Sequence, residues 1–355
     1  MNLNTLGLSP AAQAFTEDEN LNDFLLARVS AVHRDRYTLQ DAKQTYSAEI
    51  TGNLRYSVHD SSELPAVGDW VKAIPSGENS AVILEVLERS SLLKRKAVNK
   101  FGEGQSIAAN LDQAFIVQAV GQDFNLNRLE RYLAICNAAP ISAILIISKV
   151  DLISKAGMQS YIDKVKARHP DLEVLGFSNF DPASIAQIAQ KMQAQKSYCI
   201  LGSSGVGKST LINALRADDQ IKTQSISSSN QKGRHTTTHR ELFILANGAI
   251  VIDTPGMREI GITDDASALE ATFESIQEIA QNCKFSDCQH EGEKGCAIQA
   301  ALDSGELSEE LYASYLKLKL EQKHYSTSLK EKRAKERAQG KLFKAGKAHR
   351  KNHKY

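Results

Sequence analysis

Between about Asn22 and Ala97, short runs of apolar and β-branched residues are separated by turn signals such as Thr51-Gly52-Asn53 and Pro75-Ser76-Gly77. These runs predict five strands, at residues 24–32, 36–39, 45–50, 70–74 and 81–87. Five short strands in a segment of this length are typical of a small closed β-barrel, of which the OB-fold is the commonest five-stranded type. A small β-domain without a binding role is the alternative. Residues 1–20 show little pattern, and we expect a flexible extension there.

From about Leu111 the pattern changes to apolar strands that alternate with helices. The predicted strands cover residues 111–120, 141–148, 173–177, 198–201, 241–246 and 249–252, and the predicted helices cover residues 125–139, 157–168, 182–195 and 208–216. This alternation is the pattern of a doubly wound, mostly parallel α/β sheet. After Gly256 the chain turns helical, with helices predicted at 266–280 and 308–325 on either side of a cysteine-rich loop.

The composition is ordinary for a soluble globular protein, because 42% of the 355 residues are hydrophobic and 24% are charged. No apolar run approaches the roughly eighteen residues that a membrane span needs. The N-terminus lacks the basic stretch and apolar segment of a secretory signal, and the acidic residues within 17–23 argue against a transit peptide. We therefore expect a cytoplasmic protein without a membrane partner.

A net charge of +1 conceals a strong asymmetry along the chain. From Lys317 to the end there are 14 Lys and Arg against 3 Asp and Glu, so this segment carries +11 and the rest carries −10. A basic tail on an acidic body indicates a polyanionic partner, because binding would release counterions from phosphates. A solvated tail that only aids solubility is the alternative.

A phosphate-binding loop is predicted at Gly202-Ser203-Ser204-Gly205-Val206-Gly207-Lys208-Ser209. It follows a buried-type strand and precedes a helix, which is the context that a Walker A match requires. The glycines allow backbone N–H groups to face the phosphates, and the helix N-terminus adds a favourable field. We expect Lys208 to reach the β- and γ-phosphates and the Ser209 hydroxyl to bind Mg²⁺.

Two further segments complete the predicted phosphate site. Asp253 ends a second apolar strand and suits a Mg²⁺ carboxylate, while the backbone N–H of Gly256 can sense the γ-phosphate. Between the two motifs, Gly233–Arg240 is the predicted switch, in which Thr238 is the expected Mg²⁺ ligand and Thr237 the alternative. The polar, Ser-rich residues 225–232 before it predict the mobile loop that a switch requires.

The segment Ser148-Lys149-Val150-Asp151 follows a buried strand and has the pattern of a guanine-reading loop. Asp151 could accept both N1–H and N2–H of guanine, and Lys149 would lay its aliphatic stem over the base. Ser148 stands where asparagine is usual and makes fewer hydrogen bonds. Ser178 ends the next strand, where a supporting base loop should lie, and ATP specificity stays open.

The four motifs occur in an unusual order, because the guanine-reading loop precedes the phosphate loop. A complete but reordered set predicts a circularly permuted GTPase. The residues expected to bind GTP are Ser148, Lys149, Val150, Asp151, Ser178, Gly202, Ser203, Ser204, Gly205, Val206, Gly207, Lys208, Ser209, Thr210, Asp253 and Gly256.

A metal site is predicted in the cysteine-rich loop, where the spacing is Cys283-x4-Cys288-x-His290-x5-Cys296. Three cysteines and a histidine are a recognised structural zinc set, and four protein ligands leave no open position for catalysis. Buried free thiols are the alternative. Cys136 and Cys199 fit core positions instead.

With these residues assembled, the chain resembles the ribosome small-subunit-dependent GTPase A family (RsgA, also called YjeQ or YloQ). The resemblance includes Ala66-Val67-Gly68-Asp69-Trp70-Val71, Leu93-Lys94-Arg95, Ala109-Asn110-Leu111-Asp112-Gln113, the permuted motifs, the switch and the Cys₃His loop. It implies an OB-fold, a permuted GTPase domain and a C-terminal zinc domain that act late in small ribosomal subunit assembly. It also implies rRNA binding and low intrinsic GTPase activity that the small subunit stimulates. Ser148 is the main departure from the family pattern.

The resulting organisation is a flexible extension at 1–20, an RNA-binding OB-fold at 21–97, a permuted GTPase domain at 98–262, a zinc-binding helical domain at 263–325 and a basic tail at 326–355. We expect a monomer. Two other functions stay open: a GTPase switch acting on a protein or membrane partner, and an RNA-binding module whose nucleotide site is structural.

The predicted reaction is the in-line attack of water on the γ-phosphate of GTP, giving GDP and phosphate. Met257 occupies the place of the water-orienting glutamine of many GTPases, and a thioether cannot orient water. We hypothesise that His235 swings in from the switch when the ribosome orders that loop; a role for His235 in binding only rRNA or solvent is the alternative. Because Gly256 leads straight into the zinc domain, nucleotide state is expected to reorient that domain.

Overall fold

The structure, a computed structural model, describes residues 2–18, 23–33, 36–58, 61–96, 104–223, 240–253 and 266–325. Four of the predicted elements lie outside these residues: the switch 233–239 with His235 and Thr238, the turn holding Gly256 and Met257, the boundary at 262/263, and the tail 326–355.

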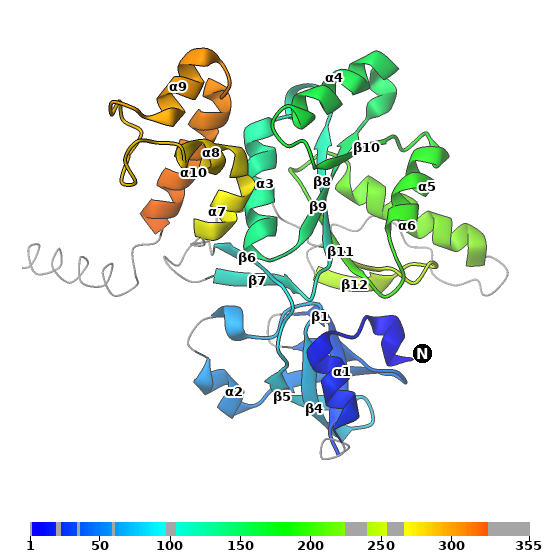
Figure 1. The fold of residues 1–355 in the computed structure, drawn as a ribbon. Coiled ribbons are helices and arrows are strands. Elements are labelled where there is room, and N and C mark those ends of the chain that lie inside the picture. The colour runs from blue at the N-terminus through cyan, green and yellow to red at the C-terminus, as the bar shows by residue number, and fades with distance from the viewer. Residues whose placement is uncertain are drawn as a thin grey trace, which may run out of the picture.

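The N-terminal strands close into the predicted five-stranded barrel at the bottom of Figure 1. Its strands are β1 Leu25–Val32, β2 Tyr37–Gln40, β3 Thr45–Ile50, β4 Trp70–Gly77 and β5 Ser80–Val86. They are ordered β1-β2-β3-β5-β4, and β4 returns to pair with β1. The alternating side chains of each strand fill the barrel with a core that includes Val29, Leu39, Val71 and Ile83. The turn predicted at Thr51 instead starts the short helix α2 Gly52–Ser57, because the Thr51 hydroxyl caps it.

The central domain has the predicted doubly wound sheet. Its strands, in spatial order, are β10 Glu173–Phe177, β9 Ser142–Ser148, β8 Gln113–Ala119, β11 Ser197–Leu201, β13 Ile250–Asp253 and β12 Arg240–Ile244. The first five run parallel, and β12 is antiparallel to β13. Nearly every residue of β8, β9 and β11 is buried, as expected for strands covered on both faces.

Helices cover both faces of this sheet (Figure 1). They are α3 Leu126–Ala138 and α4 Lys155–Lys166 on one face, and α5 Pro182–Lys191 and α6 Lys208–Thr223 on the other. Leu129 and Val165 belong to the core under the first pair, while Ile188 and Leu211 belong to the core under the second. The two apolar cores therefore hold the sheet between its two layers of helices.

A hairpin joins the barrel to this domain. It consists of β6 Leu92–Lys96 and β7 Gly104–Ala109, which the strand patterns did not predict. The boundary predicted at residue 97 falls between these two strands, among residues that the structure does not describe. The backbone carbonyl oxygen of Ser106, in β7, accepts a hydrogen bond from the Arg240 guanidinium at 2.9 Å.

The barrel and the central sheet are continuous, because β1 also pairs with β12. The partners are Ala31 with Glu241 and Val32 with Arg240, so the barrel strands and the central strands form one sheet of eleven strands. The strand that follows the predicted switch is therefore hydrogen-bonded to the barrel.

Arg28 is completely buried at this junction. Its guanidinium donates to the carbonyl oxygens of Leu6 and Gly68 and to the Ser197 hydroxyl at 2.8 Å. Burial lowers the pKa of Arg28 to about 10, and the charges of Asp112 and Asp69 oppose that shift. One side chain thus connects the N-terminal segment, the barrel and the central sheet.

The prediction of a flexible N-terminal extension is wrong for residues 2–18. Helix α1 Pro10–Glu17 is started by Pro10 and by the Ser9 hydroxyl, which caps Ala12 at 3.2 Å. Leu6 is fully buried in a core with Trp70, whose indole donates to the Gly7 carbonyl at 3.2 Å. The sequence pattern missed this because the segment is held by distant residues and not by a periodicity of its own.

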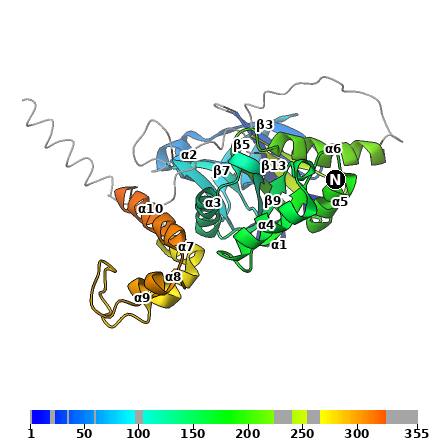
Figure 2. The same ribbon diagram turned by 90° about the horizontal axis from the view of Figure 1, so that it is seen from above.

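The C-terminal region is a small helical domain that lies beside α3 (Figure 2). It contains α7 Ala266–Thr272, α8 Glu274–Ala280, α9 Ala297–Ser304 and α10 Glu309–Tyr325. The single helix predicted at 266–280 is wrong, because the chain bends at Phe273. The Phe273 ring is buried edge-on against Tyr315, with centroids 5.4 Å apart, and the bend directs it into this core.

Arg28→Ala is expected to lower the free energy of unfolding by about 3 kcal/mol, because it leaves several buried acceptors without a donor. The measurement is urea denaturation followed by the fluorescence of Trp70, whose ring centroid lies 5.9 Å from the guanidinium carbon. The control Arg36→Ala removes an exposed ion pair with Glu49 and should cost less than about 1 kcal/mol. Equal urea-denaturation midpoints for the two variants would contradict the stabilising role of Arg28 at the junction.

Candidate nucleotide site and metal centre

The predicted nucleotide-binding segments converge at one edge of the central sheet. The phosphate loop follows β11, the guanine-reading segment follows β9, Ser178 follows β10 and Asp253 ends β13. These four strands are parallel, so their carboxyl ends lie at the same edge (Figure 1). Ligands of open α/β sheets bind at this edge.

The phosphate loop needs its glycines for steric reasons. Gly202 has a φ of +146°, and a Cβ there would lie only 2.4 Å from the carbonyl oxygen of Val117. Gly205 and Gly207 also have positive φ. Any other residue at these positions would strain the backbone. Because they are glycines, the loop can lie close to the neighbouring strand β8 and present its backbone N–H groups.

Lys208 begins α6, and its ammonium group lies inside the phosphate loop. It donates to the carbonyl oxygens of Gly202, at 2.7 Å, and of Ser203. Ser209 and Thr210 are exposed on the first turn of the same helix. The cationic ammonium, the helix N-terminus and the exposed hydroxyls are groups of the kind that could bind phosphate and Mg²⁺.

Asp253 lies at the end of β13, partly buried. Burial raises the pKa of its carboxyl, while the charges of Arg216 and Lys208 act in the opposite direction. A cation near this group would favour the carboxylate form, which is the form that binds Mg²⁺.

Ser148 connects the guanine-reading segment to the phosphate loop. Its side chain is buried, with 1% of the residue exposed, and its hydroxyl donates to the carbonyl oxygen of Val206. A hydroxyl has a single hydrogen to donate, so this bond uses it. A side chain buried this deeply acts on a nucleotide through the loop that it holds.

Asp151 lies in the loop after β9 and is held by Ser178, whose hydroxyl donates to its Oδ1 at 2.7 Å. A carboxylate has about four acceptor positions, so this bond leaves capacity for the two guanine N–H groups. Lys149, two residues before Asp151, adopts the left-handed backbone conformation with a φ of +61°, and its side chain is exposed. The structure therefore brings Ser178 to Asp151, in the relative positions that the sequence predicts.

Helix α3 contributes two side chains to the phosphate loop that sequence reasoning missed. Arg128 donates to the Ser203 hydroxyl at 2.7 Å, and Tyr132, one turn later, is buried and has its pKa influenced by that hydroxyl and by the charge of Arg128. Burial raises the pKa of Tyr132, which keeps its phenol neutral. Their spacing of four residues places them on one helix face, but nothing in the sequence indicates which loop that face contacts.

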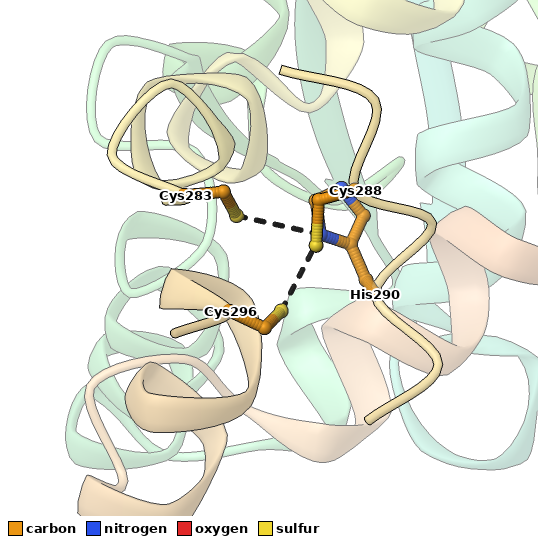
Figure 3. A group of neighbouring side chains, drawn as sticks. All are labelled: Cys283, Cys288, His290 and Cys296. Atoms are coloured by element: carbon orange, nitrogen blue, oxygen red, sulfur yellow. Dashed lines mark hydrogen bonds between the residues drawn. The ribbon is translucent and has the colours of Figure 1, made fainter. Parts of the chain in front are cut away.

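The predicted metal ligands also converge, as Figure 3 shows for Cys283, Cys288, His290 and Cys296. Their ligand atoms all lie within 4.8 Å of one another, and His290 Nδ1 is 3.6 Å from Cys283 Sγ and 3.5 Å from Cys296 Sγ. Tetrahedral coordination with metal–sulfur bonds of about 2.3 Å requires sulfurs about 3.8 Å apart. The group could therefore hold a metal ion with four ligands.

The two other cysteines are core residues, as predicted. Cys136 and Cys199 are fully buried, and burial raises the pKa of the Cys136 thiol to about 12 and that of Cys199 well above its usual value. Both thiols therefore stay protonated and unreactive at neutral pH.

Comparison with known proteins finds one family that matches this chain. A family model described as RsgA GTPase matches residues 86–263. The chain is 40% identical over 299 residues to the small ribosomal subunit biogenesis GTPase RsgA 2 of Listeria monocytogenes serotype 4b (strain F2365), with 84% of each chain covered. YjeQ from Thermotoga maritima matches with 25% identity and a TM-score of 0.62, covering 83% of this chain and 97% of that one. YloQ, a circularly permuted GTPase, matches with 26% identity and a TM-score of 0.61, covering 88% and 99%.

Ser148→Ala is expected to weaken the binding of GTP and of GDP by about tenfold, since the Val206 carbonyl loses its partner and the phosphate loop loosens. Equilibrium titration with a fluorescent GDP analogue measures this change. Ser142→Ala, at the exposed start of the same strand, is the matched control and should bind normally. Unchanged affinity in Ser148→Ala would show that the loop keeps its conformation without this bond.

Proposed function

Since this chain belongs to the RsgA GTPase family, we propose that it hydrolyses GTP in the late assembly of the small (30S) ribosomal subunit. The hydrogen bond from Ser148 to Val206 is the observation that carries the nucleotide part of the proposal. It joins the proposed guanine-reading and phosphate-binding segments, which occur in permuted order along the chain, into one site. The name of the Listeria relative supports the ribosomal role.

In the proposed reaction, water attacks the γ-phosphate in line and GDP leaves. Lys208 neutralises charge on the β- and γ-phosphates, while Ser209, Asp253 and Thr238 hold the Mg²⁺ that accompanies GTP. Asp151 reads the guanine edge. Met257 cannot orient water, so we assign that role to His235 of the switch.

The polyanionic partner in this proposal is the rRNA of the small subunit. The chain from Lys317 onward carries +11 whereas the rest carries −10, so the C-terminal end is the part that phosphates attract. The barrel is the second candidate RNA surface, because OB-type barrels commonly bind oligonucleotides. The chain would act as a monomer in the cytoplasm. Among the described residues, none of the helices is long and apolar enough to cross a membrane.

We assign zinc to the Cys₃His group, one ion per chain, with a structural role. Three thiolates and one imidazole are soft and borderline ligands, which suit zinc, and all four positions are filled by protein. Zinc would stabilise a domain whose apolar core comes from only four helices and a short loop.

Helix α3 is the proposed physical link between nucleotide state and the zinc-binding domain. Its N-terminal turn contacts the phosphate loop through Arg128. Further along α3, Arg131 forms a bidentate ion pair with Glu321 of α10, with N–O distances of 2.6 and 2.7 Å. Asn137, near the end of α3, donates a hydrogen bond to the Thr272 hydroxyl of α7 at 2.9 Å. A shift of the phosphate loop against α3 would therefore move the surface on which α7 and α10 pack.

GTP turnover by the full chain, measured with and without purified small ribosomal subunits, tests the proposed function. We expect slow turnover alone and strong stimulation by the subunit, because the switch must be ordered before water is positioned. Lys208→Ala is the control and should abolish both rates.

Substantial turnover without stimulation would point to another partner, and no turnover under either condition would make the nucleotide site structural; each outcome overturns the proposal. His235→Ala should lose the stimulated rate while binding GTP normally. Full stimulated turnover in that variant would remove His235 from the mechanism.

Cys296→Ser is expected to lower the zinc content from about one ion per chain to nearly none and to unfold the C-terminal domain, because metal binding and folding are linked. Atomic emission spectroscopy measures the metal, and limited proteolysis measures the folding. Cys136→Ala, a core cysteine outside the cluster, should retain its zinc. Equal zinc content in both variants would contradict the assignment.

Arg131→Ala is expected to reduce the difference in small-subunit affinity between the GDP form and the form with a non-hydrolysable GTP analogue. The wild-type chain should show a clear difference, and sedimentation binding assays measure it. Glu306→Gln alters an exposed side chain of the same domain and is the control. Equal affinities of the two wild-type forms would contradict the coupling itself.

A further inference from the structure

Two large apolar side chains are exposed in the loops around the candidate guanine site. Phe180 is 82% exposed and Leu152 is 70% exposed. Phe180 lies two residues after Ser178, and Leu152 directly follows Asp151. Exposed side chains of this size cost solvation free energy, so a pair of them beside one polar site indicates a ligand with an apolar face.

The loop that carries Phe180 is well anchored. The Ser178 hydroxyl accepts a hydrogen bond from the Phe180 N–H at 3.1 Å and donates to Asp151 Oδ1 at 2.7 Å. The Ser178 N–H donates to the Ser184 hydroxyl at 3.1 Å, and the Asp181 side chain caps α5. These bonds hold the backbone of the loop that carries Phe180, and the Ser178 hydroxyl joins that backbone to the Asp151 carboxylate.

A guanine base at this site has an edge and two faces to be covered. Asp151 reads the edge, and the aliphatic stem of Lys149 can cover one face. The Ser148 hydroxyl donates its one hydrogen to the Val206 carbonyl oxygen, so it has none left to donate to the base. The second face remains, and the anchored loop after β10 offers one large flat side chain to cover it.

We propose that Phe180 stacks on the guanine base, on the face opposite Lys149, and so supplies binding energy at a site where serine replaces asparagine. The inference rests on the proposed GTP function and assigns one subsite of it. Stacking on an aromatic ring is insensitive to base identity, so Phe180 sets affinity while Asp151 sets the preference for guanine.

Phe180→Ala should raise the Kd for GTP, GDP and ATP by the same factor, about tenfold, mainly through faster dissociation. Phe285→Ala removes another exposed phenylalanine, 49% exposed on the C-terminal domain, and should bind nucleotide normally. Asp151→Ala should instead reduce the preference for GTP over ATP.

Phe180→Trp gives a direct spectroscopic signature. The chain has one tryptophan, Trp70, which is fully buried in the core that packs the N-terminal segment on the barrel. The new indole should restore nucleotide affinity, and its emission should be quenched when GDP binds. The wild-type emission should not change.

Wild-type affinity in Phe180→Ala, or an unquenched Phe180→Trp, would overturn the stacking while the wild-type chain still binds GTP. If the wild-type chain bound no guanine nucleotide, the proposed function would fall and the stacking with it. Loss of small-subunit binding with normal nucleotide affinity in Phe180→Ala would assign the ring to the ribosome and overturn the proposal as well.

Discussion

Parallel strands of one sheet end at the same edge, and the nucleotide site depends on this constraint. The segments after β9, β10 and β11 and the end of β13 meet there whatever their order along the chain. Permutation therefore leaves the site intact, provided that the loops contact one another across the edge. The bonds from Ser148 to Val206 and from Ser178 to Asp151 are those contacts. They fix the spacing between the proposed phosphate-binding segment and the proposed guanine-reading segment.

Permutation changes what the site is connected to. The strand after the switch, β12, pairs with the barrel through β1, and Arg240 at its start also bonds the hairpin strand β7. The buried Arg28 then holds the barrel and the N-terminal segment against the central sheet. The barrel is therefore joined to the central domain by a continuous sheet and by a buried side chain.

The C-terminal domain is attached differently. It packs on α3 through polar contacts, the ion pair of Arg131 with Glu321 and the hydrogen bond of Asn137 with Thr272. Such contacts can rearrange at lower cost than a continuous sheet. One helix thus contacts both the phosphate loop and the domain that holds the Cys₃His group.

The sequence by itself determined the barrel, the doubly wound sheet, the permuted motif order and the Cys₃His cluster. Each depends on a local pattern: strand periodicity, a loop between a strand and a helix, or closely spaced ligands. Only the tertiary structure decided that residues 2–18 are packed, that Arg28 is buried at the junction, that Arg128 reaches Ser203, and that the chain bends at Phe273. These features depend on contacts between residues far apart in the chain, and no local pattern of hydrophobic and polar residues encodes the partner of such a contact.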